Sequence, residues 1–260
     1  MSVSICFMEI STDKYVVGSP VMPGSPAEKQ AMEYLSTQIF EEHSQTLHPD
    51  LVPYLDEHPE LEIILRHPLV YQVPLWSNGS ANKIYEHKKK EIKRVLLEKD
   101  YRTYVWLHER PHRLTAFEEI SDELTDVNYW KLVSSIWTDT ENSYADYKKW
   151  RSLFSSKRSS KHYLMDEKED QLLRSLPDEV VIYRGCQKNL NENGLSWSLD
   201  KSTAEFFANR FNQKGIIEFF ANRSNQKGII LEKKISKKDI IAVFTGRGEA
   251  EVIFNDTSIE

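Results

Sequence analysis

Two glutamates near the C-terminus, Glu249 and Glu251, are spaced so that an extended chain would point both side chains to one face. Two carboxylates that lie close together raise one another's apparent pKa values, which suits a pair with different duties in acid–base chemistry. An isolated Glu-x-Glu also fits an exposed polar strand face, so the spacing alone leaves both interpretations open. Val252 and Phe254 alternate with the glutamates and would anchor such a strand in a core.

Two segments upstream carry side chains that can bind and orient charged groups. Arg184 and Gly185 end a strand-like run that begins at Val180, and the guanidinium offers a planar fork of donors for a diphosphate or a carboxylate. A structural ion pair is the alternative interpretation of this arginine. Ser196 and Ser198 lie in a Gly-Leu-Ser-Trp-Ser segment, for which polar strand residues are the alternative.

The order of these segments points to a known family. An arginine at a strand end, a Ser-x-Ser segment followed by an apolar helix, and a Glu-x-Glu that opens a strand resemble the R-S-E class of mono-ADP-ribosyltransferases. The resemblance covers about residues 178–256. It implies a strand-rich, NAD-binding transferase core after a helical N-terminal part, and thus an α+β fold class.

The resemblance also implies a role for each matched residue. The reaction breaks the bond between nicotinamide and ribose in NAD⁺, which is a substrate, through an oxocarbenium-like transition state. Glu251 would hold the ribose hydroxyl and oppose the cation, while Glu249 would align or deprotonate the incoming nucleophile. Ser196 would fix Glu251, and Arg184 would bind the pyrophosphate. Gly185 would let the backbone approach the dinucleotide.

The remaining residues of the expected NAD-binding site come from the same three segments. Ser198 is assigned to it by its motif, and Phe207 is a candidate for stacking on nicotinamide, with core packing of Phe206 and Phe207 as the alternative. Trp197 stands where the family has a threonine, and we expect this departure to alter the wall of the nicotinamide pocket. No histidine follows His162 and no Cys/His cluster exists, so no metal is expected.

The acceptor of ADP-ribose and the biological role stay open between alternatives. In the family, Glu-x-Glu accompanies transfer to protein arginine, whereas several bacterial relatives modify nucleic acid. A leaderless transferase of this kind resembles a toxin or phage-related effector of the toxin–antitoxin or phage-defence type, and would need a neutralising antitoxin or inhibitor protein. The alternative function is a catalytically inactive module of the same fold that binds nucleic acid or a protein partner.

Composition and charge set further limits. The 260 residues are 40% hydrophobic and 28% charged, which is typical of a globular protein. No apolar run is long enough to span a bilayer, no signal peptide is evident, and the two cysteines form no disulfide framework, so we expect a cytoplasmic location. Residues 1–82 hold three basic and eleven acidic side chains, whereas the remainder holds thirty-one and twenty-nine. Basic stretches at 83–94 and 147–165 would suit a phosphate backbone or a solvated helix face.

Periodicity divides the chain into three expected parts. Residues 1–82 are expected to be an acidic, helical or irregular region, with a strand or arm over 3–17, a helix over about 26–43 and only short helices among the prolines of 48–76. Residues 77–80 are expected to form a loop. Residues 83–176 are expected to be helical with basic faces, and the last helix ends before Pro177. Strands are expected at 180–183, 229–235, 240–244 and 251–254, with a helix from about Ser202, all within a transferase core over 177–260. Residues 1–82 are expected to modulate this core.

An internal repeat lies inside the expected core. Residues 205–217 and 218–230 differ only at Phe211 and Ser224 across thirteen positions. A recent duplication in a surface connection is the favoured interpretation. A functional lengthening of a loop beside the site is the alternative.

Overall fold

The computed structural model describes residues 45–57, 63–72, 78–188, 191–210, 228–246 and 248–255. The chain forms two compact units, Met1–Arg94 and Val95–Glu260. The architecture mixes helices and antiparallel sheets, which agrees with the expected α+β class. The strand or arm at 3–17 and the helix at 26–43 lie outside the described residues.

The first unit contains a small antiparallel sheet in the order β1-β2-β3, preceded by the 3₁₀ helix η1 (Val52–Tyr54). The strands are β1 (Leu55–Glu57), β2 (Ile63–His67) and β3 (Val70–Gln72). The expectation of only short helices among these prolines is confirmed by η1, but the sequence did not predict the three strands. Pro68 lies in the tight turn between β2 and β3, where its fixed φ suits a turn, and the apolar Ile63–Leu65 run is buried as a strand.

The long helix α2 (Asn78–Leu97) follows, and its residues up to Arg94 belong to the first unit. The basic amphipathic helix expected after the Asn-Gly segment is thus confirmed, but the loop expected at 77–80 was wrong for Asn78–Ser80, which form the first turn of α2. Ala81 and Tyr85 turn inward and pack with Leu51 and Leu65 in the core of this unit. The expected boundary between residues 82 and 83 falls within α2.

An ionic cluster ties the chain before the small sheet to α2. Asp50 accepts hydrogen bonds from Tyr85 Oη at 2.6 Å and Lys89 Nζ at 2.8 Å. These bonds, from Lys89 first and Tyr85 second, lower the pKa of Asp50 to about 2. His48 Nε2 lies 2.9 Å from Glu86 Oε1.

The second unit begins with helices, as expected for residues 83–176. They are α3 (Tyr101–Leu107), η2 (Arg110–His112), α4 (Arg113–Ile120), η3 (Ser121–Glu123), α5 (Asp126–Asp139), α6 (Tyr147–Phe154), η4 (Lys161–Leu164) and α7 (Glu167–Ser175). The Thr125 side chain caps α5, and the predicted apolar face of this helix is buried, with Trp130 and Val133 fully inaccessible.

The strand-rich part forms a five-stranded sheet in the order β6-β4-β5-β8-β7, and every neighbouring pair is antiparallel. The strands are β4 (Glu179–Gln187), β5 (Ser196–Ser198), β6 (Gly228–Ser236), β7 (Ile240–Phe244) and β8 (Glu251–Phe254), with the helix α8 (Lys201–Arg210) after β5 and η5 (Lys237–Asp239) before β7. All four expected strands and the helix expected from about Ser202 are therefore confirmed.

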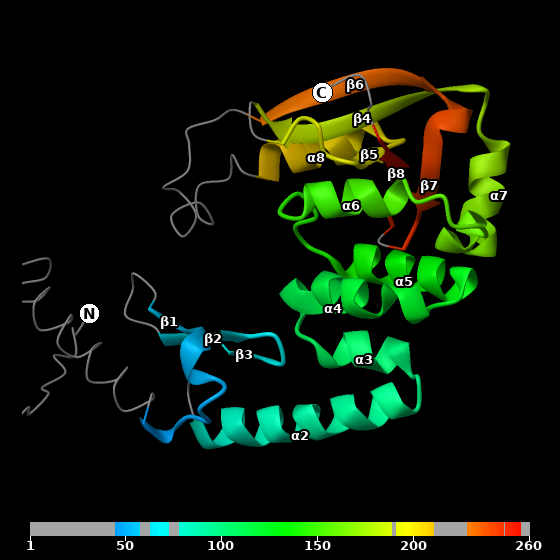
Figure 1. Cartoon of the computed structure of the whole chain (residues 1–260). Helices are drawn as coiled ribbons and strands as arrows, with labels where there is room; N and C mark the ends of the chain where they lie inside the picture. The colour runs from blue at the N-terminus through cyan, green and yellow to red at the C-terminus, as the bar shows by residue number, and fades with distance from the viewer. Residues whose placement is uncertain are drawn as a thin grey trace, which may run out of the picture. The chain divides into compact units, whose positions relative to one another are not determined.

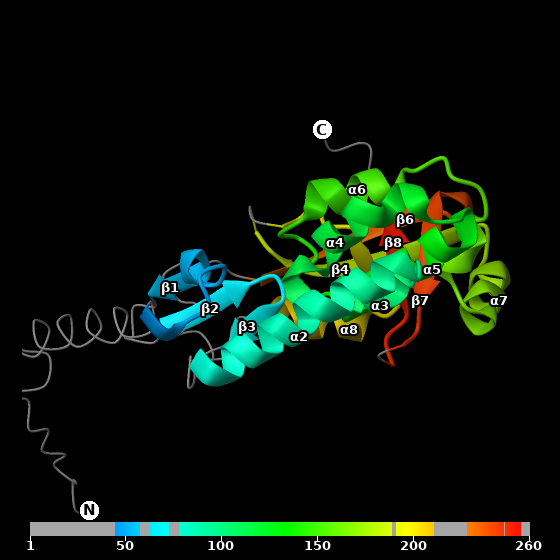
Figure 2. The same ribbon diagram turned by 60° about the horizontal axis from the view of Figure 1, so that its bottom comes forward.

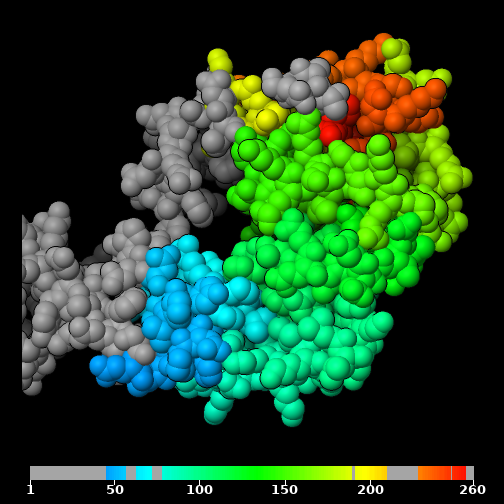
Figure 3. All heavy atoms as spheres, in the orientation of Figure 1, coloured from blue at the N-terminus to red at the C-terminus, as the bar shows by residue number. Residues whose placement is uncertain are grey.

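One face of this sheet is an apolar core. Ile182, Trp197, Val252 and Phe254 are buried there, together with partly buried side chains of α7 such as Leu172. Figures 1 and 2 both show α7 beside β7. In Figure 3 the green helices of this unit pack directly against the orange and red strands. The anchoring role expected for Val252 and Phe254 is confirmed, because both lie in this core.

The internal repeat straddles a helix and a strand. Residues 205–210 of the first copy form the second half of α8, and residues 228–230 of the second copy begin β6. Residues 211–227 lie outside the described residues, so neither interpretation of the repeat is tested. Within the described residues, no helix is long and apolar enough to cross a membrane.

Candidate active site

The sheet brings the predicted serine and glutamate together. β5 pairs with β8 so that Ser198 lies opposite Glu251, which makes Ser196 its diagonal neighbour on the same face. Ser196 Oγ donates a hydrogen bond to Glu251 Oε1 at 2.5 Å. The two residues are 55 positions apart in the chain, so this contact depends on the strand order and register.

A second donor to Glu251 comes from the helical part. Trp137 Nε1, near the end of α5, lies 3.3 Å from both carboxylate oxygens of Glu251. The indole is 4% exposed and packs edge-on against Trp150 and Phe154, with ring centroids 5.0 and 5.1 Å away. The sequence analysis missed this residue, because a tryptophan with helical spacing indicates only a buried face.

Glu251 lies in a cavity of about 330 Å³, a size within the range of small-molecule sites. Residues of α5 and the segment after it form one part of the wall, and the sheet, α8 and the chain between β7 and β8 form the rest. The lining residues are Trp137, Thr138, Thr140, Glu141, Ser143, Ser196, Phe207, Phe244, Gly246, Glu249 and Glu251. Among these described residues there are three carboxylates, three aromatic rings and no lysine or arginine.

Glu249 lines the same cavity but is not part of β8, which begins at Glu251. The extended Glu-x-Glu expected from the sequence is therefore only half correct. Glu249 follows Gly248, whose φ of 71° is a left-handed conformation that glycine adopts without strain. A bend in the chain before β8, and not the alternation of side chains along a strand, brings the Glu249 carboxylate into the same cavity as that of Glu251.

The chain before Glu249 is anchored by a buried carboxylate on α7. Glu169, which is 8% exposed, accepts a hydrogen bond from the backbone N–H of Thr245 at 2.9 Å through Oε1. Its other oxygen completes the capping box of α7 by accepting from the N–H of Asp166. One side chain thus fixes both a helix start and the end of β7.

Arg184 makes its described hydrogen bonds to backbone carbonyls. Nε and Nη2 donate to the Asn191 carbonyl at 3.2 and 2.9 Å, and Nη1 donates to the Ser196 carbonyl. Gly194 lies beneath the guanidinium, where a Cβ would be 2.0 Å from Nη2. Burial lowers the pKa of Arg184, while nearby groups that include Glu251 oppose this shift. Arg184 thus fixes the segment that leads into β5, and its pyrophosphate-binding role stays a prediction.

Gly185 allows a close approach, but the neighbour is protein. A Cβ at this position would be 1.9 Å from the Ala204 carbonyl oxygen and 2.6 Å from the Ala208 amide nitrogen, both in the backbone of α8. Figure 1 shows α8 lying along β4. The missing Cβ of Gly185 therefore makes room for the backbone of α8, whereas the sequence led us to expect a dinucleotide there.

The two side chains beside Ser196 do not face the cavity. Ser198 is 6% exposed, and its Oγ accepts a hydrogen bond from the N–H of Asp200 at 3.0 Å. Trp197 points to the opposite face of β5, into the apolar core, where its Nε1 donates to the Gly194 carbonyl at 3.1 Å. The expected effect of Trp197 on the pocket wall was therefore wrong, because strand alternation turns it away from Ser196.

The helix α8 contributes one ring to the cavity. Phe207 is a lining residue, whereas its neighbour Phe206 is 61% exposed. Their rings form a T-shaped contact, with centroids 5.5 Å apart. Phe207 therefore lines the same cavity as the two glutamates, and its stacking on nicotinamide stays a prediction.

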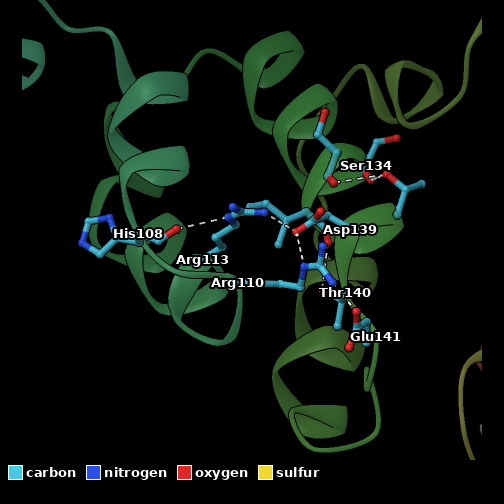
Figure 4. A network of polar contacts seen from close by, with 10 residues as sticks. His108, Arg110, Arg113, Ser134, Asp139, Thr140 and Glu141 are labelled. Atoms are coloured by element: carbon cyan, nitrogen blue, oxygen red, sulfur yellow. Dashed lines mark hydrogen bonds and ion pairs between the residues drawn. The ribbon is translucent and has the colours of Figure 1, made fainter. Parts of the chain in front are cut away.

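An arginine pair holds the end of α5, as Figure 4 shows, next to residues that line the cavity. Asp139 is shared by Arg113, which contacts it through Nη1, and Arg110, whose Nε lies 3.4 Å from Oδ2. Arg110 also binds Glu141, one of the lining carboxylates. Arg113 donates in addition to the His108 carbonyl at 3.2 Å. These contacts fix the segment that follows Trp137.

The described residues contain no group of three or more His, Cys, Asp or Glu arranged to hold a metal ion. Comparison with known proteins gave no matching family, no matching curated protein and no matching solved structure.

Proposed function

We propose that this protein is an NAD⁺-dependent mono-ADP-ribosyltransferase and that its Val95–Glu260 unit has an ADP-ribosyltransferase-like fold. The observation that carries the proposal is the hydrogen bond from Ser196 to Glu251 at 2.5 Å, inside a cavity that Glu249 also lines. The R-S-E resemblance assigns these roles to the same residues. Arg184 supports it as well, because its guanidinium holds the Ser196 carbonyl.

The proposed reaction cleaves the bond between nicotinamide and C1 of the ribose. Nicotinamide leaves as a neutral molecule with the bonding electron pair, and the ribose acquires oxocarbenium character. The carboxylate of Glu251 opposes that positive charge, as carboxylates do in glycoside cleavage. An acceptor N–H then forms the new bond to C1 and releases its proton to Glu249.

The walls of the cavity suit the cationic end of NAD⁺. Phe207 and Phe244 contribute aromatic rings to the lining, and Glu141 lines the cavity together with the two catalytic candidates. Aromatic faces and carboxylates both attract a positively charged ring. A volume of about 330 Å³ accommodates the nicotinamide riboside part of the substrate.

The proposed acceptor is a macromolecule, with protein arginine favoured over a nucleic-acid base. Glu249 and Glu141 favour a cationic guanidinium in this cavity. As an enzyme of this class, the protein would act as a cytoplasmic toxin or effector, which requires a neutralising antitoxin or inhibitor in its own cell.

The test is incubation of the full-length protein with adenylate-labelled NAD⁺ and cell lysate, followed by protease or nuclease treatment of the product. Label released by protease and retained after nuclease is the expected result. Label released by nuclease and retained after protease would show nucleic-acid modification and overturn the protein-arginine acceptor. Absence of nicotinamide release by the wild type would favour a catalytically inactive binding module.

A further inference from the structure

Glu251 is held between two structural layers. Ser196 Oγ, on the neighbouring strand, donates to Oε1 alone, whereas Trp137 Nε1, on α5, lies 3.3 Å from both oxygens. A donor shared by both oxygens fixes the direction of the carboxylate group, and a donor to one oxygen fixes its rotation. The R-S-E motifs contain the first donor only.

The indole is a rigid donor. It is 4% exposed, and the rings of Trp150 and Phe154 meet it at 88° and 73°. The arginine contacts to Asp139 further hold the end of the helix that carries it. Because the ring is fixed by packing, its N–H stays aimed at Glu251 at little entropic cost.

The chemistry of the donor adds a second effect. An indole N–H donates and never accepts, so it hydrogen-bonds the ionised carboxylate better than the protonated acid. A serine hydroxyl both donates and accepts and therefore does not discriminate in this way. The carboxylate form is the one that opposes an oxocarbenium-like charge.

We propose that Trp137 is a positioning residue that holds the carboxylate of Glu251 aimed into the cavity. In its effect on turnover, this inference rests on the proposed function. The hydrogen bond itself is testable without any activity.

The matched comparison is Trp137→Phe against Trp130→Phe. Both residues lie on α5 and are buried, and Trp130 Nε1 also donates, to the Ser159 carbonyl at 2.7 Å. Each change removes one indole N–H and keeps an aromatic ring. We expect Trp137→Phe to lower kcat for nicotinamide release by about tenfold to hundredfold, the range for hydrogen bonds to charged groups, with little change in KM. Trp130→Phe should leave kcat within about twofold of the wild type. Equal effects of the two changes, or an effect on KM alone, would overturn the proposal.

The second measurement uses the six indole N–H resonances of the ¹⁵N-labelled full chain, assigned by triple-resonance methods. Glu251→Gln should shift the Trp137 resonance more than any other indole signal, because the charge-assisted hydrogen bond is lost. Glu249→Gln should shift it less. An unmoved Trp137 signal in Glu251→Gln would refute the positioning role even if NAD⁺ is turned over. A shifted signal without turnover would instead leave the positioning intact and contradict the proposed enzyme.

Discussion

Two carboxylates, one in each unit, are held in different ways. Asp50 contacts the ammonium of Lys89 at 2.8 Å and the hydroxyl of Tyr85 at 2.6 Å, so a cation compensates its charge. Glu251, which lines a cavity, accepts hydrogen bonds from two neutral donors, Ser196 and Trp137, while the Arg184 guanidinium interacts with its charge without a described hydrogen bond to it. The first arrangement stabilises a fold, whereas the second orients a negative charge toward a space that a ligand can enter.

Removing both neutral hydrogen-bond donors to Glu251 should have the largest effect on the reaction rate. The Ser196→Ala/Trp137→Phe double variant should lower the rate of nicotinamide release by about a hundredfold to ten-thousandfold, since each hydrogen bond to a charged group contributes about 1.5–3 kcal/mol. Rates of the double and both single variants, measured at saturating NAD⁺, form a double-mutant cycle. A double variant no slower than Ser196→Ala alone would show that Trp137 contributes nothing.

Ser196→Ala alone should have a smaller effect. We expect a decrease of about tenfold to hundredfold in kcat, because the hydroxyl that fixes Oε1 is lost while Glu251 remains. Thermal unfolding should change little, since Ser196 is a partly exposed residue of a short strand. Steady-state kinetics and a melting curve on the same preparation check both parts. A loss of stability that accounts for the lost activity would contradict the role of Ser196 in orienting Glu251.

In the other unit, Asp50→Asn should lower the stability of the fold and leave the enzymatic activity unchanged. The amide retains a hydrogen-bond acceptor but loses the attraction to Lys89, so the unfolding transition of the Met1–Arg94 unit should fall by a few degrees. Nicotinamide release should equal that of the wild type. Calorimetry with a parallel rate assay tests this, and an unchanged transition would show that the ionic cluster is not stabilising.

The smallest effect is a pH dependence of the same contact. The pKa of Asp50 is lowered from 3.8 to about 2, so its ionised form stabilises the folded state above pH 4, and this contribution disappears as the pH falls from about 4 to 2. In Asp50→Asn that part of the acid destabilisation should be absent. Chemical denaturation at several pH values in this window checks the difference, and parallel curves for the two proteins would contradict it.

Local patterns predicted the elements of the second unit well. The apolar strand at Val180–Tyr183 and the helix before Pro177 depend on nearest neighbours and chain punctuation, which are visible in the sequence. The hydrogen bond between Ser196 and Glu251 was expected only from the resemblance to the R-S-E class. The contact of Trp137 with Glu251 joins residues 114 positions apart, and no local pattern encodes such a distance.

The other incorrect expectations from the sequence also have physical causes. Gly185 was expected to face a ligand, but only the packing of α8 shows which neighbour needs the missing Cβ. Trp197 was expected in the pocket because its place in the motif was considered without strand alternation. The prolines of 48–76 were expected to allow only short helices. Besides η1, the described part of this segment forms short strands and a turn.

The most direct test of the account is nicotinamide release from NAD⁺ by the purified full-length protein, compared between the wild type and Glu251→Gln. The amide keeps the size and shape of the side chain but removes the charge that opposes the ribosyl cation. The account predicts measurable release by the wild type and a loss of at least about a hundredfold in Glu251→Gln, with an unchanged melting temperature. Equal release by the two proteins would contradict it.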